Sequence, residues 1–276
     1  MIALTDEQMR DLMADMRATA EAEILPRFNG ILADAIRAKT APDDVVTDAD
    51  IGAERVLGEK LAARFPGIVM VGEEAVSNDK AILDRIDSED LVAIIDPVDG
   101  TWNFAHGVPL FGSILALVAG GRTIAGLIHY PVTGDFLIAR PGLGAWHVAP
   151  DGTETRLTVA PALPIAEMHG FVPLQAYPPA FQAELAPRLT RFRQTTTWRC
   201  SAFEYRMLAT GAMNFCVNAG LAPWDHAAGV LIHQEAGGYS ALLSGEHYAP
   251  TMTEGQLLLA PDEASWQAIR RALLED

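Results

Sequence analysis

The segment Leu91-Val-Ala-Ile-Ile-Asp-Pro-Val-Asp-Gly-Thr-Trp-Asn-Phe104 joins an apolar strand to a turn that holds two carboxylates. Asp96 follows the strand directly, and the turn that begins with Pro97 places Asp99 beside it. Two carboxylates at the end of a buried strand are costly unless a positive group binds between them. A divalent cation fits, because Mg²⁺ takes carboxylate and carbonyl oxygens as ligands. Asp96, Asp99 and the Val98 carbonyl therefore predict a metal site with a catalytic role.

Two further acidic elements lie where buried elements begin or end. Residues 68–71 form a predicted strand that leads into Gly72-Glu73-Glu74, and Trp224-Asp225 begins a predicted helix that ends near residue 236. Taken singly, each acidic motif also fits an ordinary strand end, helix N-cap or turn, and Asp50 fits a cap of the helix that follows it. Their occurrence together in one chain favours a shared metal centre.

The chemistry that such a centre supports is the hydrolysis of a phosphate monoester. Two metal ions about 3.5–4 Å apart can activate a water and stabilise the leaving oxygen of an in-line displacement. The uncatalysed reaction is extremely slow, so metal charge at the phosphoryl group contributes much. Gly100-Thr101 is predicted to begin a helix, whose N–H groups would hold a phosphate oxygen.

The composition limits the partners and the compartment. The chain has 276 residues and a net charge of −16, which argues against nucleic acid and anionic membranes as partners. No apolar run approaches the roughly 18 residues that span a bilayer, and the acidic N-terminus lacks a secretory signal pattern. Cys200 and Cys216 are predicted to be reduced core thiols, with a disulfide or a reactive thiol as the alternative. We therefore expect a cytoplasmic protein.

The order of apolar runs and turns predicts two domains. A first helix is expected from residue 5 to residue 25, where Pro26 would stop it. Strands broken by glycine turns between residues 111 and 148 predict an antiparallel meander, and the proline-rich stretch at 160–164 indicates a junction. We assign residues 1–150 to an α+β domain with the metal-binding motifs, and residues 151–276 to a smaller α/β domain that carries Asp225 and substrate-side residues.

Three motifs in this order resemble the inositol monophosphatase family: Glu73, then Asp96-Pro-Val-Asp-Gly-Thr101, then Trp224-Asp-His-Ala-Ala-Gly229 with Glu235-Ala-Gly-Gly238. The similarity covers nearly the whole chain, and the paired motifs are highly specific. The resemblance implies a Mg²⁺-dependent, typically lithium-sensitive phosphatase. It also implies a layered α-β-α-β-α sandwich, with an antiparallel sheet domain before an α/β domain, and commonly a homodimer.

The resemblance implies a ligand set for two or three Mg²⁺ ions. Glu73, Asp96 and the carbonyl of Val98 would bind the metal that activates water. Asp96, Asp99 and Asp225 would bind a second metal beside the leaving oxygen, and Glu73 would also touch a weaker third site. Only the match to the family separates Glu73 from its neighbour Glu74.

The resemblance also implies residues for the water and the phosphate. Thr101, hydrogen-bonded to Asp50, would orient and deprotonate the nucleophilic water, and Glu73 acts with them. The amides of Gly100 and Thr101 would hold the phosphate. Lys39 matches a family lysine near the site.

The substrate side departs from the family pattern. Typical members carry a Gly-Thr-Ala-like segment near Arg199-Cys200-Ser201-Ala202, and an acidic residue at the position of Asn218. Asn218 can pair with a hydroxyl but without charge assistance. Arg199 is either a structural ion-pair partner or a contact for a second anionic group on the substrate. The substrate-side residues are expected to be Lys39, Asp99, Arg199, Ser201, Asn218 and Asp225.

The leading interpretation is a phosphomonoesterase for inositol monophosphate or a similar small polyol phosphate. The same chemistry on fructose 1,6-bisphosphate, 3′-phosphoadenosine 5′-phosphate or histidinol phosphate is an alternative that Arg199 and Asn218 leave open. A catalytically silent regulatory member is a further alternative, although no residue of the expected metal set is missing. A haloacid-dehalogenase-type phosphatase is disfavoured, because its two acids are two residues apart and Asp96 and Asp99 are three apart.

Overall fold

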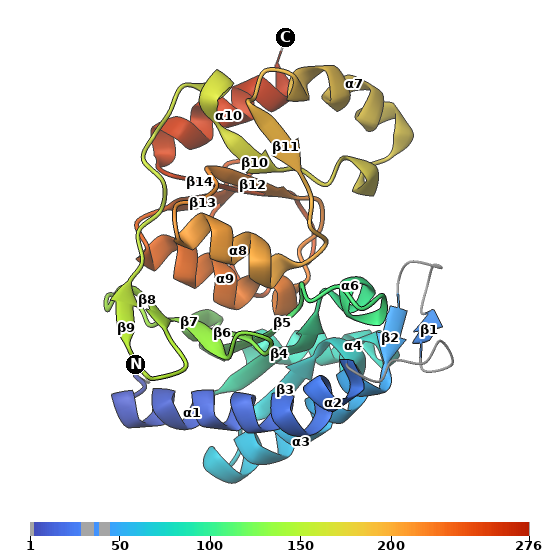
Figure 1. The fold of residues 1–276 in the computed structure, drawn as a ribbon, viewed down its shortest axis with the longest axis vertical. Coiled ribbons are helices and arrows are strands. Elements are labelled where there is room, and N and C mark those ends of the chain that lie inside the picture. The colour runs from blue at the N-terminus through green and yellow to red at the C-terminus, as the bar shows by residue number, and fades with distance from the viewer. Residues whose placement is uncertain (1–2, 29–35, 39–44, 276) are drawn as a thin grey trace.

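The computed structural model describes residues 3–28, 36–38 and 45–275. Its helices and sheets stack as α-β-α-β-α layers, which Figure 1 shows from the bottom to the top of the view. The helical layers consist of α1 (Asp6–Thr19) with α3 (Asp48–Arg64), then α8 (Ser201–Ala209) with α9 (Pro223–Glu235), then α7 (Pro179–Leu189) with α10 (Glu263–Leu274). The layered sandwich expected from the resemblance is confirmed.

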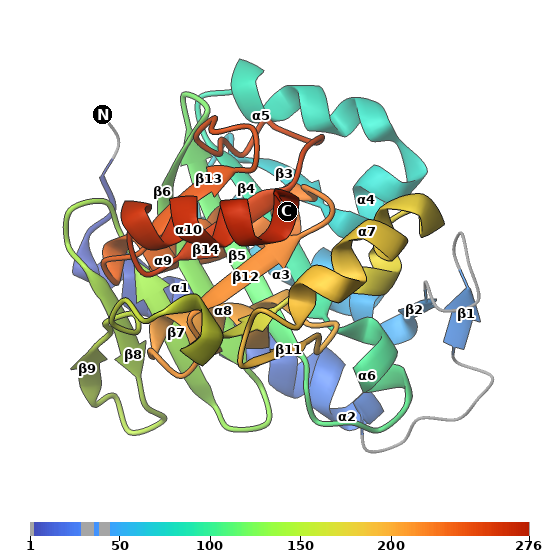
Figure 2. The same ribbon diagram turned by 90° about the horizontal axis from the view of Figure 1, so that it is seen from above.

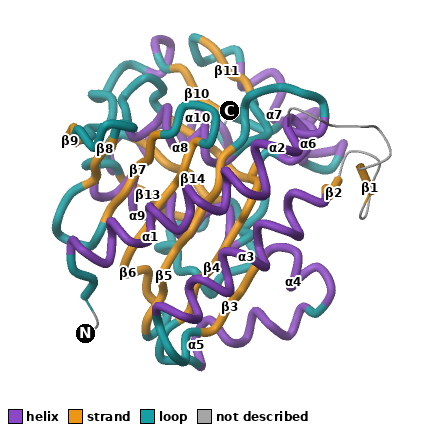
Figure 3. The backbone as a smooth tube through the Cα atoms, turned by 60° about the horizontal axis from the view of Figure 1, so that its bottom comes forward, coloured by secondary structure: helices purple, strands orange, loops and turns teal. Residues whose placement is uncertain are grey.

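The larger sheet has seven strands in the order β3-β4-β5-β6-β7-β8-β9. They are β3 (Val69–Gly72), β4 (Val92–Asp99), β5 (Gly112–Ala119), β6 (Arg122–Tyr130), β7 (Asp135–Ala139), β8 (Ala145–Val148) and β9 (Glu154–Arg156). β3 and β4 are parallel, and every later pair of neighbours is antiparallel, so the predicted meander is present. α1 and α3 lie side by side across one face of this sheet (Figure 3).

The central strand β4 is buried along its whole length. Its alternate side chains face opposite layers: Ile94 packs in the core that includes α8 and α9, whereas Ile95 packs in the core that includes α1 and α3. We expected the strand to end at Ile95, but its pairing with β5 continues to Asp99, with a register shift between Asp96 and Asp99. Residues three apart on a regular strand point to opposite faces, so this irregularity allows both carboxylates to serve one site.

The smaller sheet has five strands in the order β11-β10-β12-β14-β13. They are β10 (His169–Phe171), β11 (Gln194–Thr196), β12 (Phe215–Asn218), β13 (Tyr239–Leu242) and β14 (Leu257–Ala260). β10 is parallel to β11 and β12, and β14 is antiparallel to both of its neighbours. α10 covers β13 and β14 when the molecule is seen from above (Figure 2). β12 contacts α8 of the middle helical layer and ends at Asn218.

The remaining elements are short. They are α2 (Leu25–Phe28), β1 (Ile36–Ala38), β2 (Val45–Thr47), α4 (Glu73–Asn78), α5 (Arg85–Ser88) and α6 (Thr101–Ala105), with 3-10 turns at Lys80–Asp84, Ile165–Glu167 and Leu174–Ala176. The expectation that Pro26 stops the first helix is wrong. The chain widens into a π-helical turn, Ala20–Ile24, and Pro26 then lies in the first turn of α2, where its missing N–H costs nothing.

The middle helical layer packs closely against its neighbours. A Cβ on Gly126 of β6 would lie 2.8 Å from the carbonyl oxygen of Ala228 in α9, and one on Gly229 would lie 2.2 Å from the ring of Tyr205 in α8. These glycines let the helices approach the sheet and each other, so one continuous core joins both sheets through this layer. Within the described ranges, no helix is both long enough and apolar enough to span a bilayer.

Candidate active site

Three carboxylates converge where the end of β4 meets the start of α9. Oxygen atoms of Asp96, Asp99 and Asp225 all lie within 4.8 Å of one another. Asp96 and Asp99 are buried, and Asp225 in the first turn of α9 is half-buried. The fold thus brings together acids from two predicted motifs that are far apart in the sequence.

Burial raises the pKa of all three carboxyl groups. The pKa of Asp96 lies well above its usual value because the group is buried beside other acids, of which Glu73 has the largest effect. Burial and the charge of Asp99 raise the pKa of Asp225 in the same way. Such a cluster costs free energy unless a cation neutralises it, and every donor atom in it is an oxygen. The three acids therefore fit a hard divalent cation such as Mg²⁺.

The carboxylate of Asp99 is held by the first turn of α8. The N–H groups of Ser201 and Ala202 donate to its two oxygens at 3.1 and 2.5 Å, and the thiol of Cys200 donates at 3.0 Å. These hydrogen bonds oppose the effect of burial, which nevertheless raises the pKa of Asp99 to about 6. A helix N-terminus favours negative charge, so α8 orients the Asp99 carboxylate. Cys200 and Cys216 are both free and buried, as predicted.

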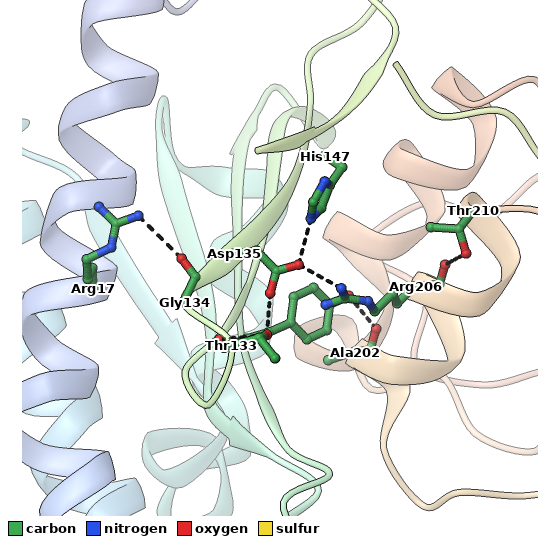
Figure 4. Close-up of polar contacts among 9 residues, drawn as sticks. Arg17, Thr133, Gly134, Asp135, His147, Ala202, Arg206 and Thr210 are labelled. Atoms are coloured by element: carbon green, nitrogen blue, oxygen red, sulfur yellow. Dashed lines mark hydrogen bonds and ion pairs between the residues drawn. The ribbon is translucent and has the colours of Figure 1, made fainter. Parts of the chain in front are cut away.

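The helix α8 is anchored in turn on the larger sheet, as Figure 4 shows. Arg206 of α8 forms an ion pair of 2.7 Å with Asp135 of β7, which His147 of β8 also contacts at 2.7 Å. The hydroxyl of Tyr130 donates to the carbonyl of Ala202 at 2.8 Å, and its ring lies 4.4 Å from the Arg206 guanidinium carbon. The sheet therefore fixes the helix that holds Asp99.

The hydroxyl of Thr101 lies between two acceptors beside the cluster. Its Oγ1 is 3.2 Å from Oδ1 of Asp50 and 2.9 Å from the carbonyl oxygen of Val98. The other oxygen of Asp50 accepts the N–H and the hydroxyl of Thr47 at 2.8 and 2.5 Å, so Asp50 also takes part in capping α3. Burial is the main cause that raises the pKa of Asp50 to about 7. A carboxyl with this pKa can gain or lose a proton near neutrality.

Gly100 adopts a conformation that a side chain would obstruct. Its φ is +86°, and a Cβ there would lie 2.8 Å from the Leu110 carbonyl oxygen and 3.1 Å from Sγ of Cys200. Gly100 is the residue that precedes α6, which begins at Thr101 as predicted. This turn brings the start of α6 against the residues that hold Asp99.

Glu73 is close to the cluster but outside the converging set of described residues. It is the first residue of α4 and follows Gly72, which lies opposite Ile95 in the parallel pairing of β3 with β4. Its negative charge raises the pKa of Asp96, Asp99, Asp225 and Asp50, which places it near all four. Glu73 itself is half-buried.

Two of the residues expected on the substrate side lie at the start of α8. Ser201 contributes its N–H to Asp99. Arg199 is exposed. Among the described residues other than glycine, it alone has a positive φ, which is 55°. Its guanidinium carbon lies 4.8 Å from the centroid of the Trp102 ring, the residue after Thr101. Strained backbone of this kind is characteristic of functional sites.

Asn218 and Lys39 complete the expected substrate-side set, of which Asp99 and Asp225 belong to the acidic cluster. Asn218, half-buried at the end of β12, accepts the Cys216 thiol at 3.6 Å. Its buried Nδ2 has no hydrogen-bond partner among the described residues. A buried donor in this state is costly. Lys39 lies outside the described residues.

A cleft of about 1000 Å³ opens beside Glu73, and its lining does not include Asp96, Asp99 or Asp225. Its walls come from α3, α4 and the start of α9, and they include Glu73 and Trp224, the neighbour of Asp225. Arg55 and Lys80 add positive charge to a lining that also contains Glu54, Glu73 and Glu74. A space of this size accommodates a small phosphorylated molecule.

Two contacts at the site were not predicted from the sequence. The Cys200 thiol reaches Asp99, and Glu54 of α3 accepts hydrogen bonds from the start of α4. Both contacts join segments that are distant in sequence. The one available signal was the spacing of Glu54, which follows Asp50 by one helical turn and therefore shares its face of α3.

The layered fold and the acidic centre fit one class of protein, the metal-dependent phosphatases. Residues 7–275 match the inositol monophosphatase family, so this chain belongs to that family. The predicted enzyme class, a phosphoric monoester hydrolase, is thereby confirmed.

Curated relatives agree with this membership, and a solved structure shares the fold. The chain is 32% identical over 226 residues to an inositol-1-monophosphatase of Bacillus subtilis, covering 82% of each protein. It is 30% identical over 216 residues to a fructose-1,6-bisphosphatase/inositol-1-monophosphatase of Thermotoga maritima, covering 77% of each. The structure of a Thermotoga maritima IMPase shares its fold, with a TM-score of 0.79, 24% identity, and coverage of 96% of this chain and 98% of the other.

Proposed function

We propose that this protein is a Mg²⁺-dependent phosphomonoesterase that hydrolyses inositol monophosphate or a similar small polyol phosphate. The observation that carries the proposal is the convergence of Asp96, Asp99 and Asp225 within 4.8 Å, next to the Thr101–Asp50 pair. Family membership supports the class of reaction, and the relative from Bacillus subtilis is named an inositol-1-monophosphatase.

Asp96, Asp99 and Asp225 would hold Mg²⁺, with Glu73 and the Val98 carbonyl completing a site for two or three ions. When bound, Mg²⁺ lowers the pKa of water and neutralises charge on the phosphoryl group. The irregular end of β4 presents two of the three aspartates, and α8 orients Asp99. This ligand set contains oxygen atoms alone, as Mg²⁺ requires.

The chain's own acid–base group is the pair formed by Thr101 and Asp50. We assign to the Thr101 hydroxyl the orientation of the attacking water, and to Asp50, whose pKa is about 7, acceptance of the proton. The water oxygen forms the new bond to phosphorus while the bond from phosphorus to the ester oxygen breaks. The backbone amides of Gly100 and Thr101 hold the phosphate. The ester oxygen leaves as an alkoxide and takes a proton from solvent water, and Asp50 then returns its proton to the solvent.

The substrate-side residues leave a second candidate substrate. Arg199 supplies a cation where Gly-Thr-Ala-like segments lack one, and Asn218 is neutral where inositol phosphatases carry an acid. Both differences favour a substrate with a further anionic group, such as fructose 1,6-bisphosphate or 3′-phosphoadenosine 5′-phosphate, with histidinol phosphate as another alternative. The relative from Thermotoga maritima named for two activities supports the bisphosphate. Lys39 belongs to the same proposed set.

Two further parts of the proposal concern the setting of the enzyme. We infer a homodimer in the cytoplasm, with a small phosphorylated metabolite as its partner and no nucleic acid or membrane. The net charge of −16 supports the exclusion of polyanions. Lithium sensitivity is part of the same proposal.

The test is phosphate release from a panel of esters, measured with Mg²⁺ and with EDTA. The panel contains inositol 1-phosphate, fructose 1,6-bisphosphate, 3′-phosphoadenosine 5′-phosphate and histidinol phosphate. Mg²⁺-dependent release is expected, and the best value of kcat/KM identifies the substrate. A folded protein that binds Mg²⁺ but hydrolyses none of these esters would favour the catalytically silent, regulatory alternative.

A further inference from the structure

The carboxylate of Glu54 caps the start of α4 from a neighbouring helix. Its Oε2 accepts the N–H of Glu74 at 2.9 Å, and its Oε1 accepts the N–H of Ala75 at 3.0 Å. The residue at the N-cap position of α4, Gly72, has no side chain for this purpose. Glu54 therefore satisfies two N–H groups that a helix leaves open at its first turn.

Gly72 is matched to this contact. A Cβ on Gly72 would lie 2.2 Å from Cδ of Glu54 and 2.3 Å from Oε2. The carboxylate can approach the turn only because residue 72 has no side chain. Gly72 and Glu54 thus form a pair that places the end of β3 against α3.

The position is electrostatically unfavourable for an acid. Glu54 lies half-buried beside Glu73 and Glu74, and burial together with their charges raises its pKa. An acid at an unfavourable position must be stabilised by the contacts it makes. The two hydrogen bonds to α4 are the contacts that the described residues provide for its carboxylate.

Glu54 and Asp50 lie one turn apart on the same helix. Asp50 contacts the Thr101 hydroxyl, and Glu54 fixes the backbone that follows Glu73. The helix α3 therefore sets the position of Glu73 relative to Thr101. α4 has only six residues, so its contacts with neighbouring elements fix its orientation, and the charges of Glu73 and Asp96 repel each other.

We propose that Glu54 is a positioning residue that holds the start of α4 so that Glu73 faces the metal centre. The inference rests on the proposed function, because it takes Glu73 as a metal ligand. Loss of the contact should lower the affinity for the ion that Glu73 binds. The site formed by Asp96, Asp99 and Asp225 should keep its geometry. Residues that orient metal ligands typically contribute tenfold or more to metal affinity.

The experiment measures Mn²⁺ binding by electron paramagnetic resonance, alongside the Mg²⁺ dependence of phosphate release. The variants are Glu54→Gln, which loses one acceptor, and Gly72→Ala, which displaces the carboxylate. Glu59→Gln is the control, since Glu59 lies on the same helix, exposed, and pairs with Arg55. Circular dichroism and a thermal melt establish that each variant is folded.

We expect Glu54→Gln and Gly72→Ala each to weaken one class of Mn²⁺ site by about tenfold and to leave the other class unchanged. The Mg²⁺ concentration for half-maximal activity should rise by a similar factor, with a smaller change in kcat at saturating Mg²⁺. Glu59→Gln should match the wild type.

Wild-type Mn²⁺ affinity in both folded variants would overturn the role of Glu54. If one of them does not fold, the other decides alone. A wild type that binds Mn²⁺ without phosphatase activity would contradict the proposed function, while the binding comparison would still decide on Glu54. A wild type that binds no Mn²⁺ would overturn both.

Discussion

The carboxylate of Asp99 accepts the backbone N–H of Ala202 at 2.5 Å, and this contact ties the end of β4 to the first turn of α8. The carbonyl of Ala202 accepts the Tyr130 hydroxyl in turn, so the larger sheet supports both partners. A carboxylate held in this way cannot turn away from Asp96 and Asp225 when they repel it. The acidic cluster is therefore preorganised before a cation binds.

Asp96→Asn should abolish turnover and preserve the fold. Asp96 belongs to both proposed metal sites, so a neutral amide removes charge from each, and kcat should fall by at least about a thousandfold. The same change removes a buried carboxyl with a raised pKa, so the thermal midpoint in EDTA at pH 7.5 should equal or exceed that of the wild type.

The control for this prediction is Asp90→Asn, an exposed carboxylate just before β4. It should keep wild-type activity and a wild-type thermal midpoint. Substantial activity in folded Asp96→Asn would refute the proposed metal chemistry.

Thr101→Val should reduce kcat by about a hundredfold or more while leaving Mg²⁺ affinity nearly unchanged. Valine has a similar shape but no hydroxyl to orient water or contact Asp50, and such acid–base groups contribute roughly 10²–10⁴ in rate. Thr101→Ser restores the hydroxyl and should recover most of the activity. Steady-state kinetics across a Mg²⁺ titration separates the two effects. Equal activity of the Val and Ser variants would exclude the proposed role of the hydroxyl.

Glu204 should make the metal-free protein less stable as the pH rises. Burial raises the pKa of Glu204 to about 7 from an ordinary 4.5. Below pH 4.5 the Glu204 carboxyl is neutral in both the folded and the unfolded state. Between pH 4.5 and pH 7 it ionises in the unfolded chain but stays mostly neutral in the folded protein. The free energy of unfolding therefore falls as the pH rises, until the pH passes 7. Glu204→Gln removes this titration and keeps an acceptor for the Trp198 N–H, which lies 3.0 Å from the carboxylate.

The free energy of unfolding of Glu204→Gln relative to the wild type should therefore increase between pH 5 and pH 8, by about 3 kcal/mol at most. Urea unfolding in EDTA at several pH values measures it, with Glu59→Gln as an exposed control. A difference that does not depend on pH would show that Glu204 does not titrate in this range.

Asn218→Glu should shift preference toward inositol 1-phosphate relative to the other esters. The new carboxylate would accept hydroxyl hydrogen bonds with charge assistance and would repel a second phosphate. The measured quantity is the ratio of kcat/KM for inositol 1-phosphate to that for fructose 1,6-bisphosphate. Asn218→Gln retains a neutral amide and should leave the ratio close to the wild-type value. An unchanged ratio in Asn218→Glu would mean that residue 218 does not contact the substrate.

Local sequence patterns predicted much of the fold. The glycine-separated strands gave the meander correctly, and the helix begun by Trp224-Asp225 ends before Gly237, whose φ is +98°. α9 carries apolar residues on all of its sides, as is typical of a helix that is buried. The sandwiching of α9 between two sheets depends on long-range packing through Gly126 and Gly229, which periodicity does not encode.

The sequence predicted the acidic residues of the candidate site, but it did not predict the contacts that orient them. Asp96 and Asp99 stand out because acids follow a fully apolar strand. The register shift that brings them together, the capping of α4 by Glu54 and the support of Asp99 by α8 arise from pairings between distant segments. The continuation of the helix past Pro26 was not predicted. The π-helical turn Ala20–Ile24 changes the hydrogen-bond pattern just before the proline, so the proline does not end the helix as it would in a regular one.

The most direct test of the central claim is the rate of phosphate release from inositol 1-phosphate as a function of Mg²⁺, for the wild type and Asp225→Asn together. We predict saturable activation of the wild type, no activity above background in EDTA, and a rate at least about a thousandfold lower for folded Asp225→Asn. Equal rates with Mg²⁺ and with EDTA, or wild-type activity in Asp225→Asn, would contradict the assignment of this cluster as the catalytic metal centre.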